Sequence, residues 1–232
     1  MKPGEVISYP DLCRHEGVSL QRGMNYRLRG QDSVILMSVQ PGAPYADRVE
    51  ENGQVLIYEG HDAARTYGVT DPKAVDQPYR SPVGSPTQNG VFFEAARAFQ
   101  RGETAAERVR VYEKIRQGIW VFNGIFLLTD AWQEPVRGRK VFKFRLEMFE
   151  QPAALRDDLA APAELDHDRV IPSAVKLEVW KRDQGKCVIC GSRDNLHFDH
   201  VIPYSKGGSS LTSGNIQILC ARHNLQKRDK IE

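Results

Sequence analysis

Hydrophobic and polar residues alternate in several short runs within the first 150 residues, and this pattern predicts β-strands. β-branched and aromatic residues fill the runs, while Gly, Pro, Asn and Asp separate them. A curved sheet or a barrel with flanking helices is therefore expected in this part of the chain. The expected strands are Ser33–Val39, Gln54–Tyr58, Arg108–Glu113, Gly118–Leu128 and Lys140–Glu147.

Apolar residues at helical spacing identify fewer elements. In Asn89–Arg101, Phe92, Phe93, Ala96 and Phe99 fall near one stripe, which predicts an amphipathic helix. Beyond residue 170 we expect two helices and one strand, the first helix capped by Ser173 and ended by Gly185. These three elements are Pro172–Gln184, Leu196–Ile202 and Cys220–Lys227.

A segment rich in Ala, Pro and acidic residues, Gln151–Arg169, lies between these two parts of the chain. It has almost no β-branched or aromatic residues, which is typical of a linker. We therefore expect an α+β protein with an N-terminal domain over 1–150, a linker over 151–170 and a C-terminal domain over 171–232.

The composition is that of a globular protein, since 41% of the 232 residues are hydrophobic and 27% are charged. The longest apolar stretch, Ile119–Leu128, is interrupted by Asn123 and Gly124 and is too short to span a bilayer. The N-terminal residues contain no apolar signal region. The expectation is a cytoplasmic protein with no membrane partner.

Positive charge is concentrated in the C-terminal part. Residues 171–232 carry 10 Lys or Arg and 6 Asp or Glu, whereas residues 1–150 carry 20 and 19. A small basic domain is typical of a module that binds phosphate groups, although charge alone does not establish a nucleic-acid partner.

Two pairs of metal-ligating residues provide the most specific signal in the sequence. Cys187 and Cys190 form one pair, and Cys220 and His223 form the second. The spacing of each pair lets a turn and a helix terminus converge on one tetrahedral ion. Because thiolate and imidazole ligands favour zinc, and four protein ligands close the site, we expect a structural Zn²⁺ that stabilises a small core.

Residues between and after the two pairs carry oxygen, imidazole and ammonium groups. They form the segments His197–Pro203, Lys206–Gly208, Asn215–Cys220 and Asn224–Lys227. On the predicted helix Asn224 follows His223, so their side chains project about 100° apart. The helix can hold the metal ion on one face and present Asn224 toward Asp199 and His200 on another. In these motifs residues 173–232 resemble the HNH nuclease family.

The HNH resemblance implies a ββα-metal fold that hydrolyses phosphodiester bonds with one catalytic metal ion. His200 corresponds to the family's first His and would act as general base. Asp199 and Asn224 would hold Mg²⁺ or Mn²⁺, with Asn224 at a position where the family pattern has His. Asn215, at the central Asn position, would brace the loop and orient His200.

Three further positions follow from the same resemblance. His223 stands where the family's fourth zinc ligand is more usually Cys, and imidazole is an equally suitable ligand. Lys206 and Lys227 are candidate contacts to DNA phosphates. Solvated side chains with no such contact are the alternative for both lysines.

Short motifs also punctuate the N-terminal part. Tyr45-Ala-Asp47 follows the first expected strand, Tyr58-Glu59-Gly60 ends the second, and Asn123-Gly124 interrupts the long apolar run. In this order, residues 20–149 resemble the SRA (SET- and RING-associated) domain, which has Tyr-Thr-Gly and Asp-Gly at the last two motifs.

The SRA resemblance implies a domain that binds double-stranded DNA, flips a modified cytosine out of the duplex and holds it between aromatic rings. Tyr45 and Tyr58 would enclose the base, and Asp47 would accept a hydrogen bond from its amino group. Glu59 would form part of the pocket wall. Asp47 follows Tyr45 by two residues where the family has three. Alternatively, the tyrosines belong to the core of the sheet.

Together the two resemblances predict a bacterial modification-dependent restriction endonuclease that recognises 5-methylcytosine or 5-hydroxymethylcytosine. Since one HNH site cuts one strand, a double-strand break implies a homodimer or two separately recruited molecules. Two other functions remain open. One is a modified-DNA-binding protein without cleavage activity, and the other is an HNH endonuclease indifferent to modification.

Overall fold

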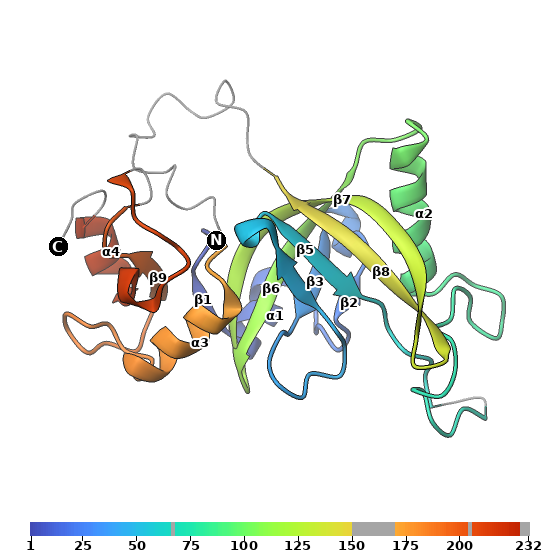
Figure 1. Ribbon diagram of the computed structural model, residues 1–232, viewed down its shortest axis with the longest axis horizontal. Helices are drawn as coiled ribbons and strands as arrows, with labels where there is room; N and C mark the ends of the chain where they lie inside the picture. The colour runs from blue at the N-terminus through green and yellow to red at the C-terminus, as the bar shows by residue number, and fades with distance from the viewer. Residues whose placement is uncertain (66–67, 150–169, 204–205, 228–232) are drawn as a thin grey trace.

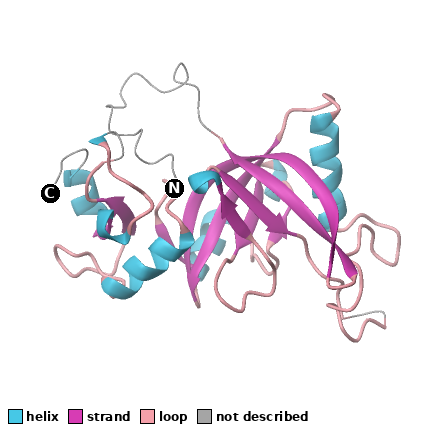
Figure 2. Ribbon diagram, viewed as in Figure 1, coloured by secondary structure: helices cyan, strands magenta, loops and turns pink. Residues whose placement is uncertain are grey.

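The computed structural model describes residues 1–65, 68–149, 170–203 and 206–227 (Figure 1). The structure contains a large twisted sheet and a small two-stranded sheet, with helices packed beside them (Figure 2). The predicted linker, 151–170, lies outside the described residues except for Val170. None of the helices in the described ranges has the length and apolar composition that a membrane crossing requires.

Eight strands form the large sheet, in the spatial order β2-β3-β6-β7-β8-β5-β4, with β1 paired to β7. Among the strand pairs of the described residues, only β3 and β6 run parallel. Within the described residues β2 and β4 lie at opposite edges, so the sheet is open and the expected barrel alternative is wrong. The strands are β1 (Val6–Ser8), β2 (Met24–Asn25), β3 (Ser33–Met37), β4 (Arg48–Glu50), β5 (Val55–Glu59), β6 (Glu107–Arg116), β7 (Ile119–Val136) and β8 (Arg139–Met148).

Two helices flank the large sheet. In α2 (Gln88–Gln100), Phe92 and Ala96 are fully buried in the main core, as the amphipathic pattern predicts. α1 (Tyr9–Glu16) was not predicted. Its Ser8 cap and Gly17 stop enclose only eight residues, which is too short for an apolar period to stand out. Short 3-10 helices cover Leu28–Gly30, Glu51–Gly53 and Ser213–Asn215.

The C-terminal part folds as helix, two strands and helix. These are α3 (Ser173–Arg182), β9 (Leu196–His200), β10 (Ile216–Cys220) and α4 (Ala221–Lys227). β9 and β10 are antiparallel, with Asp199 opposite Gln217. Ser173 is not the cap of α3, because Pro172 takes that position and Ser173 is the first helical residue.

Candidate functional site

Four metal-ligating side chains converge where β10 passes into α4. The ligand atoms of Cys187, Cys190, Cys220 and His223 all lie within 4.8 Å of one another. His223 Nδ1 is 3.4 Å from Cys187 Sγ and 3.3 Å from Cys220 Sγ, while Cys190 Sγ is 3.8 Å from Cys220 Sγ. Zinc bonds of about 2.0–2.3 Å at tetrahedral angles place neighbouring ligand atoms about 3.5–3.8 Å apart. The cluster can therefore hold a metal ion of this kind.

The chemistry of Cys187 agrees with metal binding. Burial raises the pKa of its thiol, but hydrogen bonds from the backbone amides of Cys220, Cys190 and Ile189 outweigh burial and lower the pKa to about 6. The thiol is thus largely ionised at neutral pH. Thiolate is the form of cysteine that binds metal ions.

Asp199 and His200 lie at the end of β9 and are 6% and 5% exposed. As neighbours on a strand, their side chains point to opposite faces. His200 Nε2 lies 2.8 Å from Ser210 Oγ, a partner that the sequence motifs did not identify. To act as a base at this nitrogen, His200 has to exchange the Ser210 hydroxyl for a water molecule.

Lys227 does not lie at the surface, where it was expected to contact a phosphate. Its side chain is buried, its Nζ lies 2.8 Å from Asp199 Oδ2, and it also donates to the backbone oxygen of His200. Lys227 therefore holds the Asp199 carboxylate in place. Lys206 is exposed and remains a candidate phosphate contact.

The two asparagines occupy different positions. Asn215 braces the loop that follows β9, because its Oδ1 accepts from Ile202 N at 2.7 Å and its Nδ2 donates to Ile202 O at 3.0 Å and Ser209 O at 3.1 Å. Asn224 is half-buried on α4, one turn before Lys227. Carboxylate and amide oxygens such as those of Asp199 and Asn224 are ligands that Mg²⁺ prefers.

A cavity of about 490 Å³ opens in the N-terminal part between the loop before β4 and the end of β5. Its lining includes Tyr45, Asp47, Tyr58, His61 and Gly23. Gly23 has to be glycine here, since a Cβ would lie 2.5 Å from Tyr58 Oη and 3.0 Å from His61 Nε2. The cavity thus collects three of the four residues predicted for the base pocket, together with His61.

His61 contacts both tyrosines that were predicted to enclose the base. Tyr58 is fully buried, and its hydroxyl oxygen lies 3.1 Å from His61 Nε2, within hydrogen-bond distance. The imidazole of His61 stacks on Tyr45, with ring centroids 5.7 Å apart and an interplanar angle of 28°. Lys73 Nζ also lies over the Tyr45 ring, 4.4 Å from its centroid. A base that stacks on the ring face covered by His61 has to displace the imidazole.

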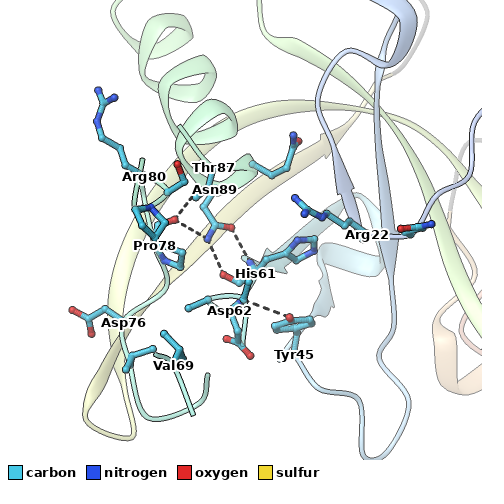
Figure 3. A pocket seen from close by; sticks show the side chains of 18 residues that line it. Arg22, Tyr45, His61, Asp62, Val69, Asp76, Pro78, Arg80, Thr87 and Asn89 are labelled. Carbon is cyan, nitrogen blue, oxygen red and sulfur yellow. Dashed lines mark hydrogen bonds between the residues drawn. The ribbon is translucent and has the colours of Figure 1, made fainter. Parts of the chain in front are cut away.

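His61 is held neutral and its backbone is fixed. Burial and the nearby positive charge of Arg22 lower its pKa to about 4, against the opposing effect of Asp62. Asn89 accepts from His61 N and donates to His61 O, both at 2.8 Å (Figure 3). The same residues line a second, larger cavity of about 1000 Å³, which includes Tyr45, His61 and Asn89 in its wall.

Asp47 and Glu59 are adjacent in space but differ in role. Asp47 accepts hydrogen bonds from the backbone amides of Ser38 and Glu59, both at 3.0 Å. Burial nevertheless raises its pKa to about 7. Glu59 was expected in the pocket wall, but its carboxylate is buried in an ion pair with Lys143, 2.8 Å away. Glu59 does not line the cavity, but its carboxylate accepts a hydrogen bond from Ala46 N, next to the lining residues Tyr45 and Asp47.

Residues 187–232 match the family model described as HNH endonuclease. The C-terminal part of the chain is an HNH endonuclease domain. No curated protein sequence is similar enough to the chain to count as a match.

Several solved structures align with the chain at low similarity. The complex of the SUVH5 SRA domain with hemimethylated CG DNA has 26% identity and a TM-score of 0.46 over 66% of this chain and 92% of that chain. The SUVH5 SRA domain bound to fully hydroxymethylated CG DNA has 25% identity and a TM-score of 0.41 over 63% and 88%. ScoMcrA, a type IV phosphorothioation-dependent restriction endonuclease, has 17% identity and a TM-score of 0.41 over 99% of this chain and 57% of that chain.

Proposed function

We propose that this protein is a metal-dependent endonuclease of the bacterial cytoplasm that cuts double-stranded DNA close to a modified cytosine. The observation that supports this function is the pairing of an HNH endonuclease domain with a cavity lined by Tyr45, Asp47, Tyr58 and His61. Aromatic rings beside a single carboxylate suit a flipped pyrimidine, which offers a π-face and an amino donor.

In the proposed complex the base stacks on Tyr45 after His61 leaves that ring. The Asp47 carboxylate then accepts a hydrogen bond from the exocyclic amino group of the base. A methyl group at the 5-position adds only apolar contact, so pocket shape distinguishes it from hydrogen by about 1–3 kcal/mol. Selectivity for 5-methylcytosine or 5-hydroxymethylcytosine thus depends on how the cavity closes around that position.

In the nuclease domain, His200 would accept the proton of the water that attacks the phosphodiester. Asp199 and Asn224 would hold Mg²⁺ or Mn²⁺, which stabilises negative charge on the phosphate when it is bound. Lys227 keeps the Asp199 carboxylate in position. Zinc held by the four Cys and His ligands would stabilise the fold without taking part in hydrolysis. Since one such site cuts one strand, two copies of the chain would act at each double-strand break.

Cleavage of matched DNAs tests this function. Otherwise identical duplexes that carry cytosine, 5-methylcytosine, 5-hydroxymethylcytosine or its glucosylated form are incubated with the protein and Mg²⁺ or Mn²⁺. We expect preferential cleavage of the first two modified duplexes, and no cleavage but retained binding by the His200→Ala variant. Equal cleavage of all duplexes would support an unselective nuclease, and binding without cleavage by the wild-type protein would support a reader alone.

A further inference from the structure

A buried charged residue joins the nuclease part to the large sheet. Lys176 on α3 places its Nζ 2.7 Å from Glu113 Oε2 on β6 and 2.7 Å from Asn123 Oδ1 on β7. Asn123 Nδ2 donates to the same carboxylate at 2.9 Å. All three residues are at most 2% exposed. The three side chains are hydrogen-bonded to one another, so the contact requires one specific geometry. Removing the lysine or the glutamate leaves the other charge buried without its ionic partner.

The N-terminal segment joins the same two parts through backbone hydrogen bonds. Gly4 N donates to Phe122 O of β7 at 2.9 Å, while Phe198 N of β9 donates to Gly4 O at 3.0 Å. Glu5 and His197 extend this contact as an isolated β-bridge. Gly4 has a φ of +86°, and a Cβ there would lie 2.9 Å from Phe198 O. Glycine therefore permits the segment to lie between both sheets.

Apolar packing continues across this contact. Ile115 and Val121 of the large sheet belong to the same buried cluster as Val175, Phe198 and Ile218 of the C-terminal part. α3 lies between the small sheet and the large sheet (Figure 1). The core of the nuclease part is thus completed by side chains from the base-binding part.

We propose that Lys176 is a positioning residue that fixes the nuclease site relative to the base cavity, so that cleavage falls at a defined distance from the modified cytosine. This inference rests on the proposed function. A flexible tether of about 20 residues has a root-mean-square span of about 25 Å, equivalent to about seven base pairs, and would spread the cuts over that distance. A nuclease part that is docked against the large sheet would instead place the cuts at one distance from the modified cytosine.

Mapping of cut positions tests the inference. End-labelled duplexes with a single modified cytosine are cleaved by the full-length protein, and both strands are analysed at nucleotide resolution. Lys176→Met removes the ammonium group but keeps an unbranched apolar side chain, and we expect its cuts to spread over several base pairs while its preference for modified DNA persists. Lys181→Met, at an exposed position on the same helix, is the matched control and should leave the cut pattern unchanged.

A second experiment inserts six Gly and Ser residues within 151–169. This insertion leaves the buried contact of Lys176 with Glu113 and Asn123 unchanged. If docking fixes the geometry, the wild-type cut position is unchanged by the insertion. Scattered wild-type cuts, or cuts that spread after the insertion, would overturn the inference and leave the proposed function intact.

Loss of modification preference in the wild-type protein would instead refute the proposed function. The contact between the nuclease part and the large sheet is then tested without DNA. Urea unfolding is followed by tryptophan fluorescence and by release of the metal ion, because two parts that share a core should unfold in one transition. The two signals should change together in the wild-type protein and separate in Lys176→Met. Separate transitions in the wild-type protein would contradict docking.

Discussion

Two titratable side chains that line the 490 Å³ cavity, His61 and Asp47, have pKa values displaced in opposite directions. His61, with a pKa of about 4, is neutral at pH 7, whereas Asp47, with a pKa of about 7, is half ionised there. Burial disfavours the charged form in both cases. The cavity therefore changes its charge near neutral pH through Asp47 alone.

Binding of modified DNA should accordingly depend on pH through Asp47. As the pH falls through about 7 its carboxyl becomes protonated and turns into a weaker acceptor for the amino group of the base, so affinity rises as the pH increases from 5.5 to 8. The rise is at most about tenfold per pH unit below the pKa. Fluorescence anisotropy with the His200→Ala variant at constant ionic strength measures it. Adding Asp47→Asn should flatten the profile; a parallel rise in both proteins would assign the titration to another group.

Removal of His61 should make the cavity easier to enter. A stacked aromatic pair contributes about 0.5–1.5 kcal/mol, and a flipped base no longer has to break the contact with Tyr45 in His61→Ala. We expect modified DNA to bind about two- to tenfold more tightly. His15→Ala, at an exposed site on α1, is the control. Weaker binding by His61→Ala would show that the imidazole contacts the base.

At the scale of elements, α4 combines two roles in residues one turn apart. His223 belongs to the metal cluster, and Lys227 reaches across to Asp199 at the end of β9. α4 therefore connects the metal cluster to Asp199. The relative positions of α4, β9 and β10 determine where the Asp199 carboxylate lies.

Lys227→Ala should reduce cleavage while leaving DNA binding almost unchanged. The variant leaves the Asp199 carboxylate without its ammonium partner, and loss of a group that supports a metal ligand costs about 10- to 100-fold in activity or metal affinity. Nicking rates and the salt dependence of the Kd are measured together. A salt slope reduced by about one unit would instead identify Lys227 as a phosphate contact.

The metal cluster should be required for the fold of the nuclease part. In Cys187→Ser one thiolate ligand is lost, and with it much of the folding free energy that metal binding supplies. We expect lower bound zinc by elemental analysis and at least about a tenfold loss of nicking, with binding of modified DNA retained. Cys13→Ser, on α1, should change neither quantity. Unchanged zinc content in Cys187→Ser would contradict the assigned ligands.

Elements defined by local signals were predicted from the sequence. The β-branched runs predicted β3, β5, β6, β7 and β8, and the spacing of Cys187, Cys190, Cys220 and His223 predicted a cluster that the folded chain assembles. The stacking of His61 on Tyr45 and the burial of Lys227 could not be predicted in this way. Both depend on how loops and helices close in three dimensions.

At the scale of the whole molecule, the parts of the chain before and after the predicted linker share a buried cluster of apolar side chains. Lys176 and Glu113 are 63 positions apart in the sequence, so no local pattern indicates that they form a pair. Lysine and glutamate are also seldom fully buried, so neither residue type predicts a buried contact. A lysine on an amphipathic helix is normally solvated. Only the tertiary structure shows that this one faces the large sheet.

The backbone hydrogen bonds of Gly4 connect strands that are synthesised at very different times. Its first partner, β7, emerges from the ribosome early enough to pair with the N-terminal strand, but its second partner, β9, follows almost 200 residues after Gly4. Translation therefore completes the strands of the large sheet before the HNH endonuclease domain is available to dock against them. Domains generally fold in the order of their synthesis, so the large sheet can fold while residues 170–227 are still being made.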